Sequence, residues 1–277
     1  MLDDRSLAAV RAMLARDAAA HCVLSARIEA ARSLAPARLG GQVMTSEADR
    51  GAVLASATFV GGTVMPCGTG AQGRVDAAAV GAWLAAQPRA CSSIVGDVAM
   101  VLALWAEAER GWGEARLLRE RQPLLATAQP PAAAPDPRVR PARPDELELV
   151  VPAAAAMFVE ELDASPFERD GGLGFRTRLA ALIEQRRVLV RIDDGAVVYK
   201  AEIGSASPFA SQIQGVWVRP DLRGAGVGTA AMSATVRYAL RLAPLATLYV
   251  NDFNLAARAV YSRLGMTQVG TFATVLF

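Results

Sequence analysis

The second half of the chain shows apolar and polar positions that predict a regular succession of helices and strands. Repeats near 3.6 residues predict helices, and alternation or short apolar runs between turn residues predict strands. The predicted helices cover residues 144–158, 175–185, 227–242 and 254–264, and the predicted strands cover 188–192, 197–204, 212–218, 246–250 and 266–276. Asp193, Asp194 and Gly195 join the first two strands as a hairpin turn.

The first half alternates in the same way. We predict helices over residues 5–17, 75–86 and the segment from Val98 to Trp105, whose apolar positions share one helix face. Strands are predicted over 23–28, 92–95 and 114–125, and two more within 40–59 around a turn at 47–51. Both halves therefore run strand, helix, strand, helix towards their ends, which suggests an internal duplication. We expect the first copy to lack a glycine-rich loop before its helix.

A segment rich in proline and alanine, residues 125–144, separates the two halves and resists both helix and sheet formation. We therefore predict an N-terminal α/β domain over residues 1–130 and a second domain over residues 138–277. The fold class expected for the whole chain is α+β, a mixed α/β arrangement in which helices flank a mixed and mostly antiparallel sheet.

Composition narrows the function classes. The 277 residues carry 29 basic and 27 acidic side chains, and this near balance argues against a nucleic-acid-binding protein. Three scattered cysteines and a single histidine, His21, favour a reducing compartment and offer neither a metal site nor a histidine triad. The apolar runs are too short to span a membrane, and the N-terminus lacks a signal-peptide pattern, so we expect a cytoplasmic protein.

The most informative stretch runs from Val216 to Thr229, where a strand ends, the chain turns at Pro220, and glycines lead directly into a helix. Free amide groups at a helix start and the helix dipole together form an anion site, and a diphosphate is its natural occupant. Arg223 would add positive charge and Thr229 a hydroxyl. A dinucleotide fingerprint over Gly226, Gly228 and Ala231, or a turn without any ligand, are the alternatives.

A second element is the helix that starts near Asn254. Tyr261 lies seven residues further on, about two turns along the same face, and Arg258 lies between the two. Taken alone, Asn254 is equally well explained as a helix cap and Tyr261 as a core aromatic with a solvated tip.

Together, the Arg223-x-x-Gly226-x-Gly228 signature and the helix from Asn254 to Tyr261 resemble the GCN5-related N-acetyltransferase (GNAT) superfamily over residues 138–277. Further segments, such as Tyr199–Glu202 and the end of the chain from Gly270, resemble actinobacterial acetyltransferases with an N-terminal DUF4081 domain. The resemblance implies a GNAT fold in the second half, and it makes the first half a candidate degenerate copy.

The resemblance also implies roles for individual residues toward acetyl-CoA. The backbone of Val216, Trp217 and Val218 and the side chain of Asn254 would contact the pantetheine arm, with Arg258 on the same helix face. The pyrophosphate would lie within the segment of Arg223, Gly224, Ala225, Gly226, Val227, Gly228 and Thr229. Tyr261 would lie beside the sulfur and protonate the leaving thiolate, since an ordinary phenol is protonated at pH 7.

The general base is harder to place, because Tyr249 stands where some relatives carry a glutamate. We predict Glu202 on the strand 197–204 for this role, with Glu160 and Glu161 near the acceptor entrance, and a water relay as a further possibility. The predicted activity is direct transfer of acetyl from acetyl-CoA to an amine of a small molecule, a peptide N-terminus or a lysine. The alternative is a non-catalytic module that binds acetyl-CoA as a sensor or scaffold.

Overall fold

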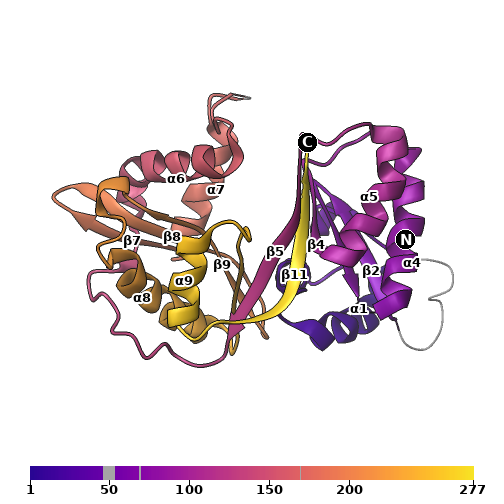
Figure 1. Cartoon of the computed structure of the whole chain (residues 1–277). Helices are drawn as coiled ribbons and strands as arrows, with labels where there is room; N and C mark the ends of the chain where they lie inside the picture. The colour runs from indigo at the N-terminus through magenta and orange to yellow at the C-terminus, as the bar shows by residue number, and fades with distance from the viewer. Residues whose placement is uncertain (46–53, 69, 169) are drawn as a thin grey trace.

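The computed structural model of the chain describes residues 1–45, 54–68, 70–168 and 170–277. Within these residues, eleven strands form one continuous sheet in the order β1-β2-β3-β4-β11-β5-β10-β9-β8-β7-β6. Two lobes result, joined at the centre by the long strands β5 and β11 (Figure 1). The expected mixed α/β fold with a mostly antiparallel sheet is confirmed, because among the described pairings only β3–β4 and β9–β10 are parallel.

The first lobe holds the elements of the N-terminal half. Helices α1, α2 and α3 precede the first strands, and α4 and α5 flank β4. Their bounds are α1 Leu7–Leu14, α2 Cys22–Ala31, α3 Pro36–Leu39, β1 Gly41–Met44, β2 Ser56–Gly61, β3 Thr63–Gly68, α4 Gly70–Ala85, β4 Ser93–Asp97, α5 Val98–Trp112 and β5 Leu117–Thr127. The turn expected at 47–51 falls outside the described residues.

Residues 23–28, predicted as a strand, are instead part of helix α2. Leu24 and Ile28 lie one helical turn apart and are buried against Val10, Met13 and Leu14 of the α1 segment. Another side of α2 packs on the second half, where the Cys22 thiol donates to the Ala210 carbonyl at 3.2 Å. Apolar residues are therefore needed on two faces, and a short run of this kind does not distinguish a buried helix from a strand. Strand β3 was not anticipated.

The second lobe follows the predicted order closely. Its elements are β6 Arg140–Pro141, α6 Leu147–Leu162, α7 Leu173–Glu184, β7 Val188–Asp193, β8 Ala196–Ala206, β9 Ser211–Val218, α8 Val227–Leu242, β10 Ala246–Tyr249, α9 Leu255–Arg263 and β11 Thr267–Leu276. The proline-rich segment between β5 and β6 runs along α8, where the Ser233 hydroxyl donates to the Ala133 carbonyl at 2.6 Å.

The two halves exchange their last strands. Strand β5 ends the first half and pairs with β10 of the second, whereas β11 ends the second half and pairs with β4 of the first. The exchanged strands also pair with each other at the centre of the sheet. The same order of strand, helix, strand, helix and exchanged strand occurs in both halves, and this supports the predicted duplication. Each lobe is consequently completed by a strand from the other.

Candidate acetyl-transfer site

Strands β9 and β10 lie side by side for only two residue pairs, Ser211 with Ala246 and Gln212 with Thr247. Beyond this point they separate, and β10 is paired on its other side with β5. The Arg219 amide donates to the Val198 carbonyl on the β8 side of β9. Because backbone groups alternate along a strand, Val216 and Val218 direct theirs toward the open edge. The predicted segment 216–218 therefore offers backbone partners along the gap.

The glycine-rich loop connects the end of β9 to the start of α8. Gly224 and Gly226 adopt φ values of +77° and +82°, and a Cβ at either position would meet open space. Glycine is thus required by the backbone conformation and not by crowding. Within the described residues, the amides of residues 224–228 donate no hydrogen bond. These free donors at the start of a 16-residue helix form the anion site that the sequence predicts.

Arg223 lies across this loop in an unexpected way. Its Nε donates to the Val218 carbonyl at 2.9 Å, and its Nη2 lies 2.9 Å from both carboxylate oxygens of Glu160. Glu160 also accepts a hydrogen bond from Trp217 Nε1 at 3.2 Å. The C-terminal end of α6 is therefore tied to the loop through Glu160, which holds the guanidinium beside the open edge of β9.

Helix α9 brings together one buried and two exposed candidates. Asn254 caps the helix, and its Oδ1 accepts from the Ala257 amide at 3.1 Å. Arg258 is exposed and donates to the Asp252 carbonyl at 2.9 Å. Asn254 thus serves as a cap in this structure, and its contact with a pantetheine arm stays a prediction, as does that of Arg258.

Tyr261, in contrast, is 7% exposed and packs beneath α8 in the core of the second lobe. Its hydroxyl forms no hydrogen bond with any other described residue. Burial raises its pKa well above the ordinary value of a phenol, and the negative charge of Glu161 adds to the effect. The hydroxyl is therefore protonated at neutral pH and free to donate, as a general acid must be.

Glu202 occupies a different environment from the one predicted. Its carboxylate is buried in a network with Lys200, Arg178 at 2.8 Å and Gln214 at 3.1 Å. Burial by itself raises the pKa of Glu202, but Lys200 and Arg178 outweigh it and lower the pKa to about 2. A carboxylate that binds a proton so weakly and is fully occupied by cations is a poor base, and the structure speaks against the predicted role.

Gly215 makes room for this network. It adopts φ of +56° at a bulge in β9, and a Cβ there would lie 3.0 Å from Lys200 Nζ and 3.4 Å from Glu202 Cδ. The bulge therefore lets β9 pass over the buried ion pair.

Of the three glutamates named in the sequence analysis, Glu161, in the last turn of α6, is the one whose carboxylate remains available as a base. Its side chain is exposed, yet the surrounding protein raises its pKa by desolvation, assisted by the charges of Glu202 and Glu160 and opposed by Arg119 and Lys200. Burial is the main cause of the raised pKa values of Tyr249 and Tyr261, and the charge of Glu161 raises both values further. Glu161 thus lies within electrostatic range of the candidate acid. Arg119 was missed by the sequence analysis, since it belongs to β5 of the first half.

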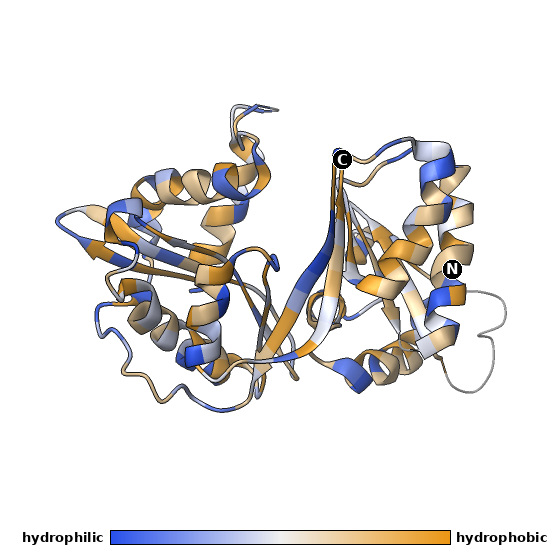
Figure 2. Cartoon of the chain, in the orientation of Figure 1, coloured by the Kyte–Doolittle hydropathy of each residue, from blue (hydrophilic) through white to orange (hydrophobic). Residues whose placement is uncertain are grey.

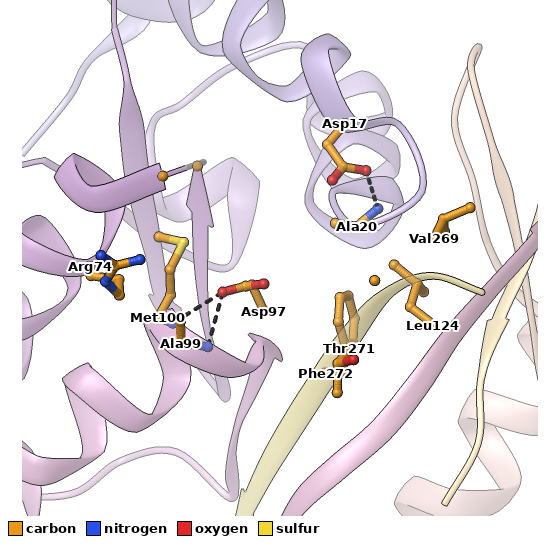
Figure 3. A pocket seen from close by; sticks show the side chains of 13 residues that line it. Asp17, Ala20, Arg74, Asp97, Ala99, Met100, Leu124, Val269, Thr271 and Phe272 are labelled. Atoms are coloured by element: carbon orange, nitrogen blue, oxygen red, sulfur yellow. Dashed lines mark hydrogen bonds between the residues drawn. The ribbon is translucent and has the colours of Figure 1, made fainter. Parts of the chain in front are cut away.

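The first half contains a cavity of about 270 Å³ at the place that corresponds to the candidate site of the second half (Figure 3). It lies between the end of β3, the first turn of α4, the start of α5 and the exchanged strand β11. Gly68 at the end of β3 and Gly70 at the start of α4 both have positive φ, and residue 69 between them lies outside the described residues. The Gly68 amide donates to Nε2 of His21 at 3.1 Å, and Asp17 and Asp97 line the space. An occupied amide and two carboxylates disfavour a diphosphate.

His21, Cys22 and Cys67 of the first half are buried packing residues. Burial lowers the pKa of His21 and raises the pKa of the Cys22 and Cys67 thiols to about 12. The pair His21–Cys22 is therefore not an activated nucleophile. In the part of the chain that the structure describes, no helix is long and apolar enough to cross a membrane.

Comparison with known families bears on whether the glycine-rich loop belongs to an acetyltransferase, to a dinucleotide-binding protein or to a turn without a ligand. Residues 156–266 match the acetyltransferase (GNAT) family. This match covers most of the second half of the chain. Residues 41–150 match the domain of unknown function DUF4081, so the resemblance found in the sequence is confirmed for both halves. No curated protein matches the chain.

Solved structures show the same fold over most of the chain. A Drosophila protein has 16% identity and a TM-score of 0.67, covering 100% of this chain and 97% of that one. A GCN5-related N-acetyltransferase from Kribbella flavida has 18% identity and a TM-score of 0.55, covering 92% and 95%. A GNAT-family acetyltransferase from Colwellia psychrerythraea has 13% identity and a TM-score of 0.54, covering 86% and 85%. These structures show the fold, and the family match over residues 156–266 supports a role in acetyl transfer.

Proposed function

We propose that the protein is an acetyl-CoA-dependent N-acetyltransferase that transfers acetyl directly to an amine within a ternary complex. The observation that carries the proposal is the gap between β9 and β10, which opens beside the unbonded amides of residues 224–228. Acetyl-CoA would supply an acetyl group activated as a thioester. Its pyrophosphate suits the amides at the start of α8, and its extended arm suits the backbone edge at Val216 and the Val218 amide, since the Val218 carbonyl is occupied by Arg223.

Tyr261 and Glu161 are the side chains that we propose for proton transfer. Tyr261 donates its hydroxyl proton to the departing sulfur, because burial keeps the phenol protonated. Glu161 accepts a proton from the acceptor ammonium, directly or through water, because its raised pKa brings it closer to neutrality than an ordinary glutamate. Glu202 holds Lys200 and Arg178 in place and takes no part in proton transfer.

The sensor or scaffold alternative shares the binding site and differs only in turnover. The Tyr261 hydroxyl favours the enzyme, because it bonds to no other described residue and is available to donate to the departing sulfur. Release of free CoA with a panel of primary amines separates the two. Binding of acetyl-CoA without turnover on any amine would support the sensor.

The binding site is tested with a matched pair of glycine substitutions. Gly226 and Gly195 have φ of +82° and +74°, and a Cβ at either meets open space, so aspartate costs the backbone a similar amount at both. Gly226→Asp places a carboxylate at the proposed diphosphate site and should abolish acetyl-CoA binding in calorimetry. Gly195→Asp, in the β7–β8 turn, should bind as the wild type does. Equal affinity in both variants would remove the loop from the site.

A further inference from the structure

The exchanged strand β5 belongs to the DUF4081 region but lies along the acetyltransferase site. Leu124 of β5 pairs with Tyr249 of β10, and the contact continues where the Val250 amide donates to the Pro123 carbonyl and the Asp252 amide to the Arg121 carbonyl, each at 3.2 Å. Residues 119–122 of β5 are polar, and they stand between the two lobes as the blue stretch of this strand (Figure 2).

Two arginines reach from this part of the first half to the last turn of α6. Arg119 Nη2 donates to the Glu161 carbonyl, and Arg116 Nη1 donates to the Leu162 carbonyl at 3.0 Å. The last carbonyls of a helix have no partner inside the helix and carry its negative dipole end, so cationic donors stabilise them. The first half therefore fixes the turn on which Glu161 stands.

The charges around the Glu161 carboxylate come from three elements, and two further elements carry the phenols that respond to it. Arg119 on β5 and Lys200 on β8 are the cations, and Glu202 on β8 and Glu160 on α6 are the anions, while the phenols of Tyr249 on β10 and Tyr261 on α9 respond to Glu161. Lys200 is paired with Glu202, and Glu160 is paired with Arg223. Arg119 is the cation in this set that donates to a carbonyl instead of pairing with a carboxylate.

We propose that Arg119 is a positioning residue for the Glu161 carboxylate, so that the DUF4081 region completes the acceptor side of the acetyltransferase site. Arg119 holds the end of α6 through a carbonyl and, through its charge, favours the ionised carboxylate that accepts a proton. The effect on turnover rests on the proposed function. The effect on Glu161 itself does not, because it follows from the contacts of the folded chain.

The decisive measurement follows the ionisation of Glu161 in the full-length protein without any substrate. Carbon NMR of protein labelled at the glutamate carboxyls gives the titration, and the signal lost in Glu161→Gln assigns the residue. Arg119→Met should raise the pKa of Glu161, and Arg119→Lys should return it toward the wild-type value. Arg116→Met is the matched control: it removes the same charge and the neighbouring cap, but Arg119 is the cation with the largest effect on Glu161, so the pKa should change far less than in Arg119→Met.

Turnover is then measured as CoA release with the amines that the wild type acetylates. Arg119→Met should lower kcat about tenfold or more, since misplacement of a catalytic group by about 1 Å has effects of this size or larger. The acid limb of its pH profile should move in the same direction as the titration. Arg119→Lys should recover part of the loss.

The outcomes separate the two proposals. An unchanged Glu161 titration in Arg119→Met, or an equal change in Arg116→Met, overturns the role of Arg119 even if the protein is an active acetyltransferase. If no amine is acetylated while Arg119→Met alone moves the titration, the proposed function fails and the contact between the halves stands. If the methionine variant does not fold, Arg119→Gln gives the same comparison, because it removes the charge and keeps a side-chain donor for the Glu161 carbonyl.

Discussion

Replacing Tyr261 by phenylalanine removes one oxygen atom from the centre of the proposed site. The hydroxyl has no hydrogen-bond partner among the described residues, so its loss leaves no buried donor or acceptor without a partner. The ring keeps its packing against the core of the second lobe, which includes Met232, Val236 and Leu264. We therefore expect the free energy of unfolding to change by less than about 0.5 kcal/mol.

The expected effect on catalysis is much larger. General acid catalysis contributes roughly 10²- to 10⁴-fold, so Tyr261→Phe should lower kcat by at least about 100-fold, which corresponds to about 2.7 kcal/mol in the activation free energy. Affinity for acetyl-CoA should stay within about twofold of the wild type, because the phenol acts only on the departing sulfur. Burial raises the pKa of Tyr261, so deprotonation of this phenol should produce no loss of activity below pH 10.

The assay combines CoA release, calorimetry with acetyl-CoA and urea unfolding. Tyr238→Phe provides the matched control, since the Tyr238 hydroxyl donates to the Arg186 carbonyl at 2.7 Å on the surface and should not affect turnover. The reasoning is refuted if Tyr261→Phe keeps wild-type kcat. It is also refuted if the loss of kcat is matched by a loss of stability of several kcal/mol, because the hydroxyl would then have a structural partner.

Two further predictions concern the scaffold of the site. Gly215→Ala should destabilise the fold by about 1–3 kcal/mol in urea unfolding, because its Cβ adds left-handed strain and crowds Lys200 Nζ; an unchanged midpoint would contradict the role of the bulge. Glu146, whose pKa hydrogen bonding to Arg140 lowers from an ordinary 4.5 to about 2, should contribute about 2 kcal/mol, because the full difference of about 3 kcal/mol is reduced by the 40% exposure of Arg140. This contribution is present above about pH 4.5 and is lost as the pH falls toward 2, so Glu146→Gln should unfold more readily at pH 7 and match the wild type near pH 2; equal stability at pH 7 would count against it.

The sequence by itself determined the local parts of the protein. The loop from Arg223 to Thr229 could be predicted because a left-handed backbone needs glycine and because a helix start always exposes amides. The order of elements in the second half followed from periodicity, and the spacing of Asn254 and Tyr261 on one helix needed no neighbour to be recognised. These features depend on residues within a few positions of each other.

The tertiary structure decided everything that depends on which elements become neighbours. Strands β5 and β11 are compatible with many partners, since backbone pairing is similar for any sequence, and only the folded chain shows that they are exchanged. The environment of Glu202 also depends on the tertiary structure. The sequence is compatible with a role as a base, but in the folded chain Lys200 and Arg178 lie beside its carboxylate. Arg119 gains its place next to Glu161 only through the exchange, because 42 residues separate them along the chain.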